Sequence, residues 1–246
     1  TQFAHRGRDI SVASDAANGM AGHSLPAILP KNPRIKAHTL FMQPDGTFPN
    51  HEANPLKEEN LVDLKKLVLA KKAEIGIAFD GDADRCCFVD EQGQTVGADL
   101  VTALLAPVFL KRFPGTAVVY DLRSSWAVKE EILEAGGVPV RDRVGHSFMK
   151  ATLRQKGGQF GGELSGHFYF GENFTCDSGV IAMMSALSLL TTSENKGRTF
   201  SELVAKVKRY HSTGETNFHV EDKQGRGLTL RQGINEDVNR RPGRAG

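Results

Sequence analysis

Short apolar runs alternate with segments of helical periodicity along most of the chain, and this alternation constrains the fold more than any other feature. In residues 57–72 the leucines recur at helical spacing, and the next segment, 75–79, reads Ile-Gly-Ile-Ala-Phe, as a buried strand does. Strands separated by helices are typical of α/β proteins, whose sheets are covered by helices. We expect strands at 10–14, 35–41, 75–79, 86–89, 117–120 and 138–140, and helices at 57–72, 98–112, 126–135, 147–155, 180–190 and 200–210.

The pattern divides into two units of similar size near residue 95. The length of 246 residues accommodates two ordinary domains, at about 100–200 residues each. We expect residues 1–95 and 96–207 to form two consecutive three-layer α/β units, each with a mixed sheet covered by helices. Residues 208–246 are expected to begin a further domain. From Gln224 the chain is rich in Arg and Gly, which predicts a frayed tail; a basic phosphate-binding arm is the alternative.

Charge and composition argue against several classes of partner. Lys and Arg number 31 against 29 Asp and Glu, so the net charge of +2 lacks the basic excess of a nucleic-acid-binding surface. No apolar run approaches the roughly 18–20 residues of a membrane span, and the first residues show no apolar leader. The three cysteines form no Cys-x-x-Cys pair. These observations predict a cytoplasmic protein that binds neither nucleic acid nor membrane.

An acidic segment, Asp-Gly-Asp-Ala-Asp-Arg at residues 80–85, directly follows the strand expected at 75–79. In a loop, the carboxylates of Asp80, Asp82 and Asp84 can converge on one side, where their mutual repulsion favours a hard divalent cation. Mg²⁺ fits best, because few carboxylates together with phosphate or water commonly hold it. Arg85 adds a permanently charged fork suited to a phosphate oxygen.

Two other interpretations of this segment remain. It could be a solvated acidic turn without a ligand. With Glu91 it also matches positions 1, 3, 5 and 12 of an EF-hand loop, but Arg85 stands where that loop needs glycine, and the preceding segment favours a strand rather than a helix.

A second polar segment lies among glycines at 161–167, where Glu163, Ser165 and His167 alternate. From an extended segment these side chains would point the same way and offer acceptors, a donor and a titratable group to sugar hydroxyls. Glycines let the backbone approach a ligand closely. An ordinary glycine-rich turn is the alternative, and the segment matches neither a Walker A nor a dinucleotide-binding motif.

Two further sites follow strands. Gly145 and His146 precede a helical pattern, so His146 could meet a phosphate at a helix N-terminus, although a lone histidine there is more often a surface cap. Arg123 lies between the strand at 117–120 and the helix at 126–135, where α/β proteins place ligand contacts, although a solvated arginine is the default.

Together these motifs resemble the α-D-phosphohexomutases, in particular bacterial phosphomannomutase/phosphoglucomutase. Residues 80–85 are similar to that family's magnesium loop, Asp-Gly-Asp-x-Asp-Arg, and residues 162–167 to its sugar-binding loop, Gly-Glu-x-Ser-Gly-His. The resemblance runs from about Arg8 to Lys223 and covers the second and third of four domains. No Ser-His-Asn of the family's phosphoserine loop occurs, and its Arg-x-Ser-Gly-Thr-Glu-Pro phosphate loop is absent as well.

The resemblance implies interconversion of hexose 1-phosphate and 6-phosphate through a phosphoserine and a bisphosphate intermediate. It implies Mg²⁺ on Asp80, Asp82 and Asp84, and Arg85 against the moving phosphoryl group. It further implies a hexose phosphate bound by a set of polar residues, with His167 or His146 transferring protons; this set is Arg123, Gly145, His146, Glu163, Ser165 and His167. Without the phosphoserine, we expect no mutase activity from this chain alone. A Mg²⁺- or sugar-phosphate-binding fragment and a haloacid-dehalogenase-like phosphatase are the alternatives.

Overall fold

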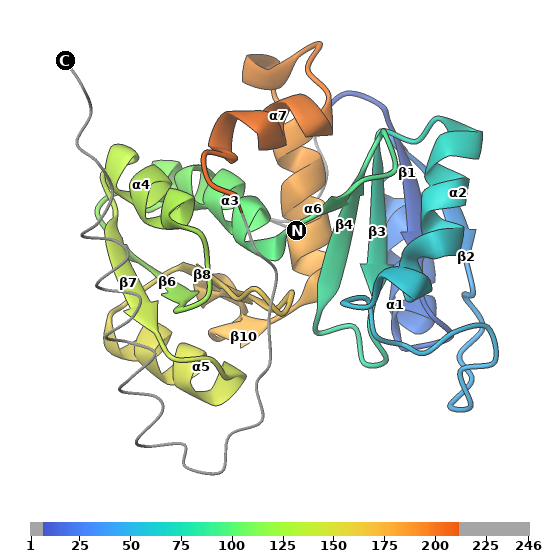
Figure 1. The fold of residues 1–246 in the computed structure, drawn as a ribbon, viewed down its shortest axis with the longest axis horizontal. Helices are drawn as coiled ribbons and strands as arrows, with labels where there is room; N and C mark the ends of the chain where they lie inside the picture. Colours follow the sequence, from blue (N-terminus) through green and yellow to red (C-terminus); the bar gives the residue numbers. More distant parts are fainter. Residues whose placement is uncertain (1–6, 212–246) are drawn as a thin grey trace. The chain divides into compact units, whose positions relative to one another are not determined.

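Two mixed five-stranded sheets, each flanked by helices, form the fold, as the alternating pattern predicts (Figure 1). The computed structural model describes residues 7–211. The tail predicted from Gln224 and nearly all of the segment 208–246 therefore lie outside the described residues. None of the helices in residues 7–211 combines the length and the apolar character that a membrane crossing needs. The predicted boundary near residue 95 stays a prediction.

The first sheet has the strand order β2-β1-β3-β4-β5, in which β1 is parallel to β2 and β3, and the last two pairings are antiparallel. Helix α1 packs on one face, where Leu25 joins Val12 in the core, and α2 packs on the other, where Leu64 meets Ala13. The strands and helices are β1 (Ile10–Asp15), α1 (Ala21–Ile28), β2 (Ile35–Leu40), α2 (Val62–Lys71), β3 (Ile75–Phe79), β4 (Cys86–Asp90) and β5 (Thr95–Val96).

The second sheet has the order β10-β9-β8-β6-β7, with β6 parallel to β7 and β8, and the other pairings antiparallel. Its elements are α3 (Ala98–Arg112), β6 (Ala117–Asp121), α4 (Trp126–Glu134), β7 (Val138–Asp142), α5 (His146–Gln155), β8 (Phe160–Gly162), β9 (Phe168–Phe170), β10 (Cys176–Asp177), α6 (Gly179–Leu190) and α7 (Phe200–Val207).

The two sheets repeat one topology, with β1 to β5 corresponding in order to β6 to β10. The acidic segment at 80–85 therefore connects β3 to β4, and the glycine-rich segment at 163–167 makes the equivalent connection between β8 and β9. The first strand of each sheet ends in a buried aspartate, Asp15 or Asp121, whose Oδ1 accepts a hydrogen bond from the backbone two residues on, at 2.8 Å in both cases. The two candidate ligand loops thus occupy equivalent positions, because each joins the third and fourth strands of its unit.

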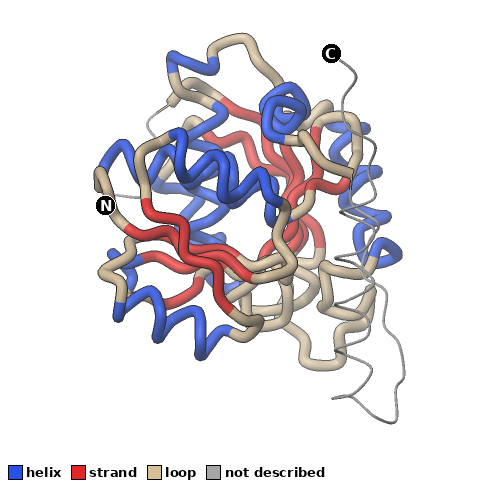
Figure 2. Tube along the Cα trace, turned by 60° about the vertical axis from the view of Figure 1, so that its left-hand side comes forward, coloured by secondary structure: helices blue, strands red, loops and turns tan. Residues whose placement is uncertain are grey.

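One hydrophobic core runs through both sheets. Phe88 on β4 lies 6.1 Å from Phe168 on β9 and 6.2 Å from Phe200 on α7, measured between ring centroids. Helices α3 and α6 lie between the two groups of strands in Figure 1, and Figure 2 shows the strands with helices beside them from a second direction. Because the core is continuous, the two sheets support each other.

Several elements differ from those predicted. Helix α1 was not expected after the turn-prone residues 15–19, and the glycine-rich stretch contains β8 where no strand was expected. The helix expected to reach residue 210 ends at Val207, because Arg209 and Tyr210 leave the helix and bind Glu130 and Glu131 on α4.

The β3–β4 loop and the first residue of β4 are joined to the β8–β9 loop and to α6 by two backbone hydrogen bonds. Cys86 N donates to Gly166 O at 3.1 Å, and Gly179 N donates to Ala83 O at 3.1 Å. At both joints glycine permits a close approach: a Cβ on Gly166 would lie 2.9 Å from Cys86 O, and one on Gly179 would lie 2.9 Å from Arg85 O. The acidic loop is thereby clamped between the β8–β9 loop and the start of α6.

We predict that Gly179→Ala lowers the free energy of unfolding by about 1–3 kcal/mol, the usual cost of overpacking. Alanine is about 1 kcal/mol more favourable than glycine inside a helix, so helix propensity alone would stabilise the variant. A loss of stability therefore identifies the close contact as its cause. Urea unfolding followed by circular dichroism measures the change. Gly46→Ala is the control, because a Cβ there meets nothing within 4 Å. Equal stability of the two variants would contradict the clamp.

Candidate active site

The β3–β4 loop gathers the three carboxylates, as their spacing predicts. Asp80, Asp82 and Asp84 each offer an oxygen, and these atoms lie within 4.8 Å of one another. Ala83 has a φ of +64°, a left-handed conformation that turns the backbone between the last two aspartates. Asp80 is buried and the other two are more accessible, so the cluster has a buried base and an open side.

This donor set fits a hard divalent cation. Burial, together with the charges of Asp80, Asp82 and Asp177, raises the pKa of Asp84 to about 7, and Arg85 only partly opposes this. The crowded carboxylates therefore resist full ionisation unless further positive charge is supplied. Oxygen-only ligands in a loop are what Mg²⁺ uses.

Arg85 is positioned by the aspartate at the base of the cluster. Its Nε donates to Asp80 Oδ2 at 2.6 Å, and its backbone N donates to Asp80 Oδ1 at 3.2 Å. The guanidinium is thus fixed through Nε, which also lies 3.9 Å from Asp84 Oδ1. Each Asp80 oxygen keeps a second lone pair for another ligand.

The glycine-rich loop is not extended, so the predicted conformation is wrong, although the side chains of Glu163, Ser165 and His167 still lie together. Glu163 N donates to His167 O at 2.9 Å and Gly166 N to Glu163 O at 3.1 Å, which closes a tight turn with a φ of +87° at Gly166. The physical reason is topological: these residues connect the antiparallel strands β8 and β9, and the chain must reverse within them.

Glu163 lies inside this turn at 1% exposure. Its Oε1 accepts a hydrogen bond from Gly145 N at 2.9 Å, and its Oε2 accepts one from the hydroxyl of Tyr169. Burial and the Glu163 carboxylate raise the pKa of that hydroxyl well above its usual range. Glu163 therefore ties the start of α5 to β9; its contact with a sugar hydroxyl stays a prediction.

His167 lies where the two loops meet. Its Nδ1 is 2.9 Å from Ser165 Oγ, and its Nε2 is 3.5 Å from Asp84 Oδ1. Burial lowers the pKa of the imidazole, although Glu163, whose carboxylate lies 3.6 Å from Nδ1, acts in the opposite direction. The ring of His146, exposed at the start of α5, lies 6.3 Å away between centroids. Both predicted proton-transfer histidines thus line one region.

Arg123 belongs to the same region through a buried aspartate. Asp121, at the end of β6 and fully buried, accepts hydrogen bonds from Arg123 Nη2 at 2.9 Å and from the backbone N of Leu164 at 2.9 Å. One carboxylate therefore links the loop after β6 to the turn after β8. The predicted site residues all lie just after the carboxyl ends of β3, β6, β7 and β8, in the loops that begin there or, for His146, at the start of α5.

Three neighbours of the candidate site were missed by sequence reasoning. Asp177 on β10 lies beside Asp84 and His167, Asp121 organises Arg123, and Tyr169 supports Glu163. Tyr169 could have been found from the sequence, because it stands between two phenylalanines and carries the one polar side-chain atom of that strand. Asp177 had none beyond its place before a helix, since its neighbours come from distant segments.

Comparisons with known protein families match both parts of the chain. Residues 1–93 match phosphoglucomutase/phosphomannomutase alpha/beta/alpha domain II, and residues 97–210 match domain III. Phosphohexose mutases of Xanthomonas campestris pv. campestris (strain B100) are 38% identical over 216 residues, which cover 87% of this chain and 47% of the relative. Phosphomannomutase of Escherichia coli (strain K12) is 36% identical over 213 residues, covering 85% and 46% respectively.

A solved structure gives the same result. The crystal structure of a phosphoglucomutase/phosphomannomutase family protein from Burkholderia thailandensis aligns with a TM-score of 0.75 and 34% identity, covering 80% of this chain and 43% of that chain. The chain belongs to the α-D-phosphohexomutase family. It covers that family's domains II and III and spans about half the length of the curated relatives it matches.

The buried Glu163 gives a stability prediction. Glu163→Ala leaves Gly145 N and the Tyr169 hydroxyl without an acceptor and should lower the free energy of unfolding by about 2–6 kcal/mol, at about 1–3 kcal/mol for each group. Glu163→Gln keeps one acceptor and can meet Tyr169 with its amide, so it should cost about 1 kcal/mol. Urea unfolding compares the two. Equal losses would show that Glu163 does not hold the turn through these hydrogen bonds.

Proposed function

We propose that this chain forms the metal- and sugar-binding part of a phosphohexomutase, which interconverts a hexose 1-phosphate and its 6-phosphate. One observation carries the proposal: the acidic loop and the glycine-rich loop meet, with Asp84 Oδ1 at 3.5 Å from His167 Nε2 and a backbone bridge between Arg85 and His167. A phosphoryl group beside the first loop would thus be within reach of a sugar held by the second.

Asp80, Asp82 and Asp84 are the residues that would hold Mg²⁺. The ion, when bound, supplies positive charge against the oxygens of the transferring phosphoryl group. Arg85, fixed through Nε by Asp80, directs its terminal amino groups to the same oxygens, and this charge stabilisation is most of what phosphoryl transfer requires from a protein.

The sugar contacts come from the second sheet. Ser165 and Arg123 offer donors at the turn, and Glu163 is proposed to complete the grip through its remaining lone pairs. Gly145 joins the start of α5 to the turn by donating its backbone N–H to Glu163 Oε1 at 2.9 Å, and His146 faces the same region. In this arrangement the polar groups of the second sheet bind the hydroxyls of the hexose, and its phosphate faces Arg85 or His146.

His167 is the better placed of the two histidines for proton transfer. It lies between Ser165 and Asp84, and burial lowers its pKa, so the neutral imidazole that accepts a proton is favoured at neutral pH. His146 is exposed and suits a phosphate contact instead.

The phosphatase alternative is weakened by Asp80. A haloacid-dehalogenase-like enzyme uses the first aspartate of Asp-x-Asp as an accessible nucleophile. Here both Asp80 oxygens accept hydrogen bonds from Arg85, and the residue is 2% exposed. A fragment that binds Mg²⁺ and hexose phosphate without chemistry is the remaining alternative, and it agrees with the absence of Ser-His-Asn from the 246 residues.

Removal of one carboxylate should weaken Mg²⁺ binding. We predict that Asp82→Asn raises the dissociation constant by at least about tenfold, or about 1.4 kcal/mol, because the ion needs compensating charge for its dehydration. Isothermal titration calorimetry measures the constant. Asp63→Asn is the matched control: it removes an acid paired with Lys66 on α2, away from the loop, and should leave binding unchanged. Unaltered affinity of Asp82→Asn would exclude the site.

The chain alone should bind a hexose phosphate without converting it. We expect ³¹P NMR of glucose 1-phosphate, with Mg²⁺ and a sugar bisphosphate primer, to show broadening by the protein and neither 6-phosphate nor inorganic phosphate. The reason is the missing serine phosphoryl carrier. Formation of 6-phosphate would contradict the inactivity, release of inorganic phosphate would favour the phosphatase, and an unperturbed spectrum would contradict the sugar site.

A further inference from the structure

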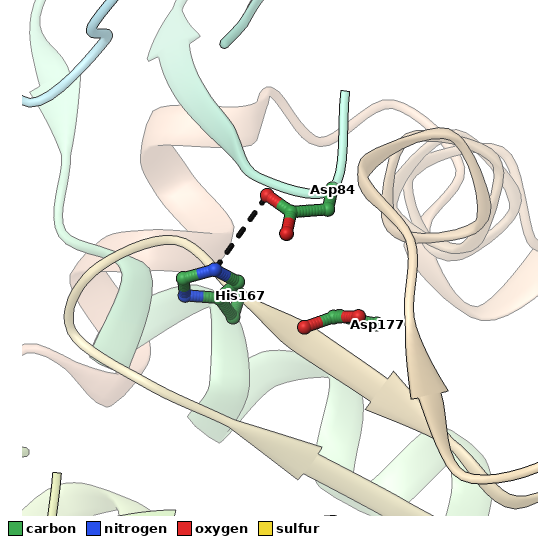
Figure 3. Close-up of side chains that lie close together, drawn as sticks. All are labelled: Asp84, His167 and Asp177. Carbon is green, nitrogen blue, oxygen red and sulfur yellow. Dashed lines mark ion pairs between the residues drawn. The ribbon is translucent and has the colours of Figure 1, made fainter. Parts of the chain in front are cut away.

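A second group of metal-binding side chains lies beside the aspartate trio. Asp84, His167 and Asp177 each offer one ligand atom, and these atoms lie within 4.8 Å of one another (Figure 3). The three come from the β3–β4 loop, the end of the β8–β9 loop, and β10. They are held together by the same joints that clamp the acidic loop, since Gly166 precedes His167 and Gly179 follows Asp177 closely.

Asp177 provides an independent sign of a ligand. Its side chain is 7% exposed, and Lys150 Nζ pairs with Oδ1 at 2.8 Å. The other oxygen, Oδ2, is buried and has no hydrogen-bond partner among the residues that the structure describes. Figure 3 shows the carboxylate turned toward His167 and Asp84. A buried carboxylate oxygen without a partner is costly, and a bound cation removes that cost.

His167 is oriented as a ligand. Ser165 Oγ lies 2.9 Å from Nδ1, and Nε2 faces Asp84. In the tautomer that donates Nδ1–H to the Ser165 hydroxyl, Nε2 carries the lone pair that can bind a metal. Metal-binding histidines are commonly oriented in this way, by a hydrogen bond from the ring nitrogen that does not bind the metal.

One imidazole with two carboxylates is a donor set that suits Zn²⁺ and Co²⁺, whereas the three-aspartate cluster offers only oxygen, the ligand that Mg²⁺ and Mn²⁺ prefer. We propose that Asp84, His167 and Asp177 form a second metal site, selective for imidazole-binding divalent transition ions, which shares Asp84 with the candidate magnesium site. The two ions then compete for one carboxylate, so each lowers the affinity of the other. This proposal does not rest on mutase activity.

Cobalt tests the site, because Co²⁺ is spectroscopically visible and accepts the same donors. Calorimetric and optical titration of the full 246-residue chain should show one Co²⁺ site that Asp177→Asn weakens by at least about tenfold, the effect of losing a ligand. Asp82→Asn is the matched control and should change Co²⁺ affinity by less than about threefold while weakening Mg²⁺. Lys150→Gln removes the ion pair to Asp177 but no ligand, so it should keep Co²⁺ binding and thereby separate a structural effect from a ligand effect.

Histidine NMR gives a second readout that does not depend on Asp177 variants folding. Paramagnetic Co²⁺ should shift the ring signals of His167, assigned with His167→Gln, and added Mg²⁺ should reduce the shift. The proposal is overturned if Co²⁺ does not bind or if Asp177→Asn binds it as tightly as the parent. It is equally overturned if Asp82→Asn abolishes binding while His167 stays unshifted, which would place the ion on the three aspartates.

Discussion

Two backbone hydrogen bonds, which tie the β3–β4 hairpin to the β8–β9 loop and to the start of α6, are the constraint on which the site depends. They join Cys86 N to Gly166 O and Gly179 N to Ala83 O, each at 3.1 Å, and glycine at both positions permits the approach. Because the three aspartates belong to this loop, their position relative to His167 is set by backbone geometry rather than by flexible side chains. The electrostatic crowding that raises the pKa of Asp84 is a consequence of that fixed arrangement.

The repeated topology explains why two chemically different loops face each other. In each sheet the third and fourth strands are joined by a hairpin, acidic in the first sheet and glycine-rich in the second. A core shared through Phe88 and Phe168 brings the two hairpins together. The first unit thus supplies the charged groups and the second supplies the groups proposed to bind a sugar, so the proposed site needs both units.

Strong local patterns were predictable and long-range contacts were not. The strand at 75–79 and the acidic loop after it follow from a run of apolar residues and a charge cluster, and the structure has both. The turn at 163–167 was predicted as extended, because alternation of polar residues does not reveal that the chain reverses at Gly166. Asp177 joins Asp84 and His167 only through sheet pairing across many residues, which no local period encodes.

The central claim is that the acidic loop and the glycine-rich loop act on one ligand. Substitution of Mn²⁺ for Mg²⁺ tests it most directly, because the paramagnetic ion accelerates the relaxation of nuclei a few ångströms away. The account predicts strongly enhanced ³¹P and sugar-proton relaxation of protein-bound glucose 1-phosphate, lost in Asp82→Asn. Bound sugar phosphate with relaxation unaffected by Mn²⁺ would place the metal and the sugar in separate sites and contradict the account.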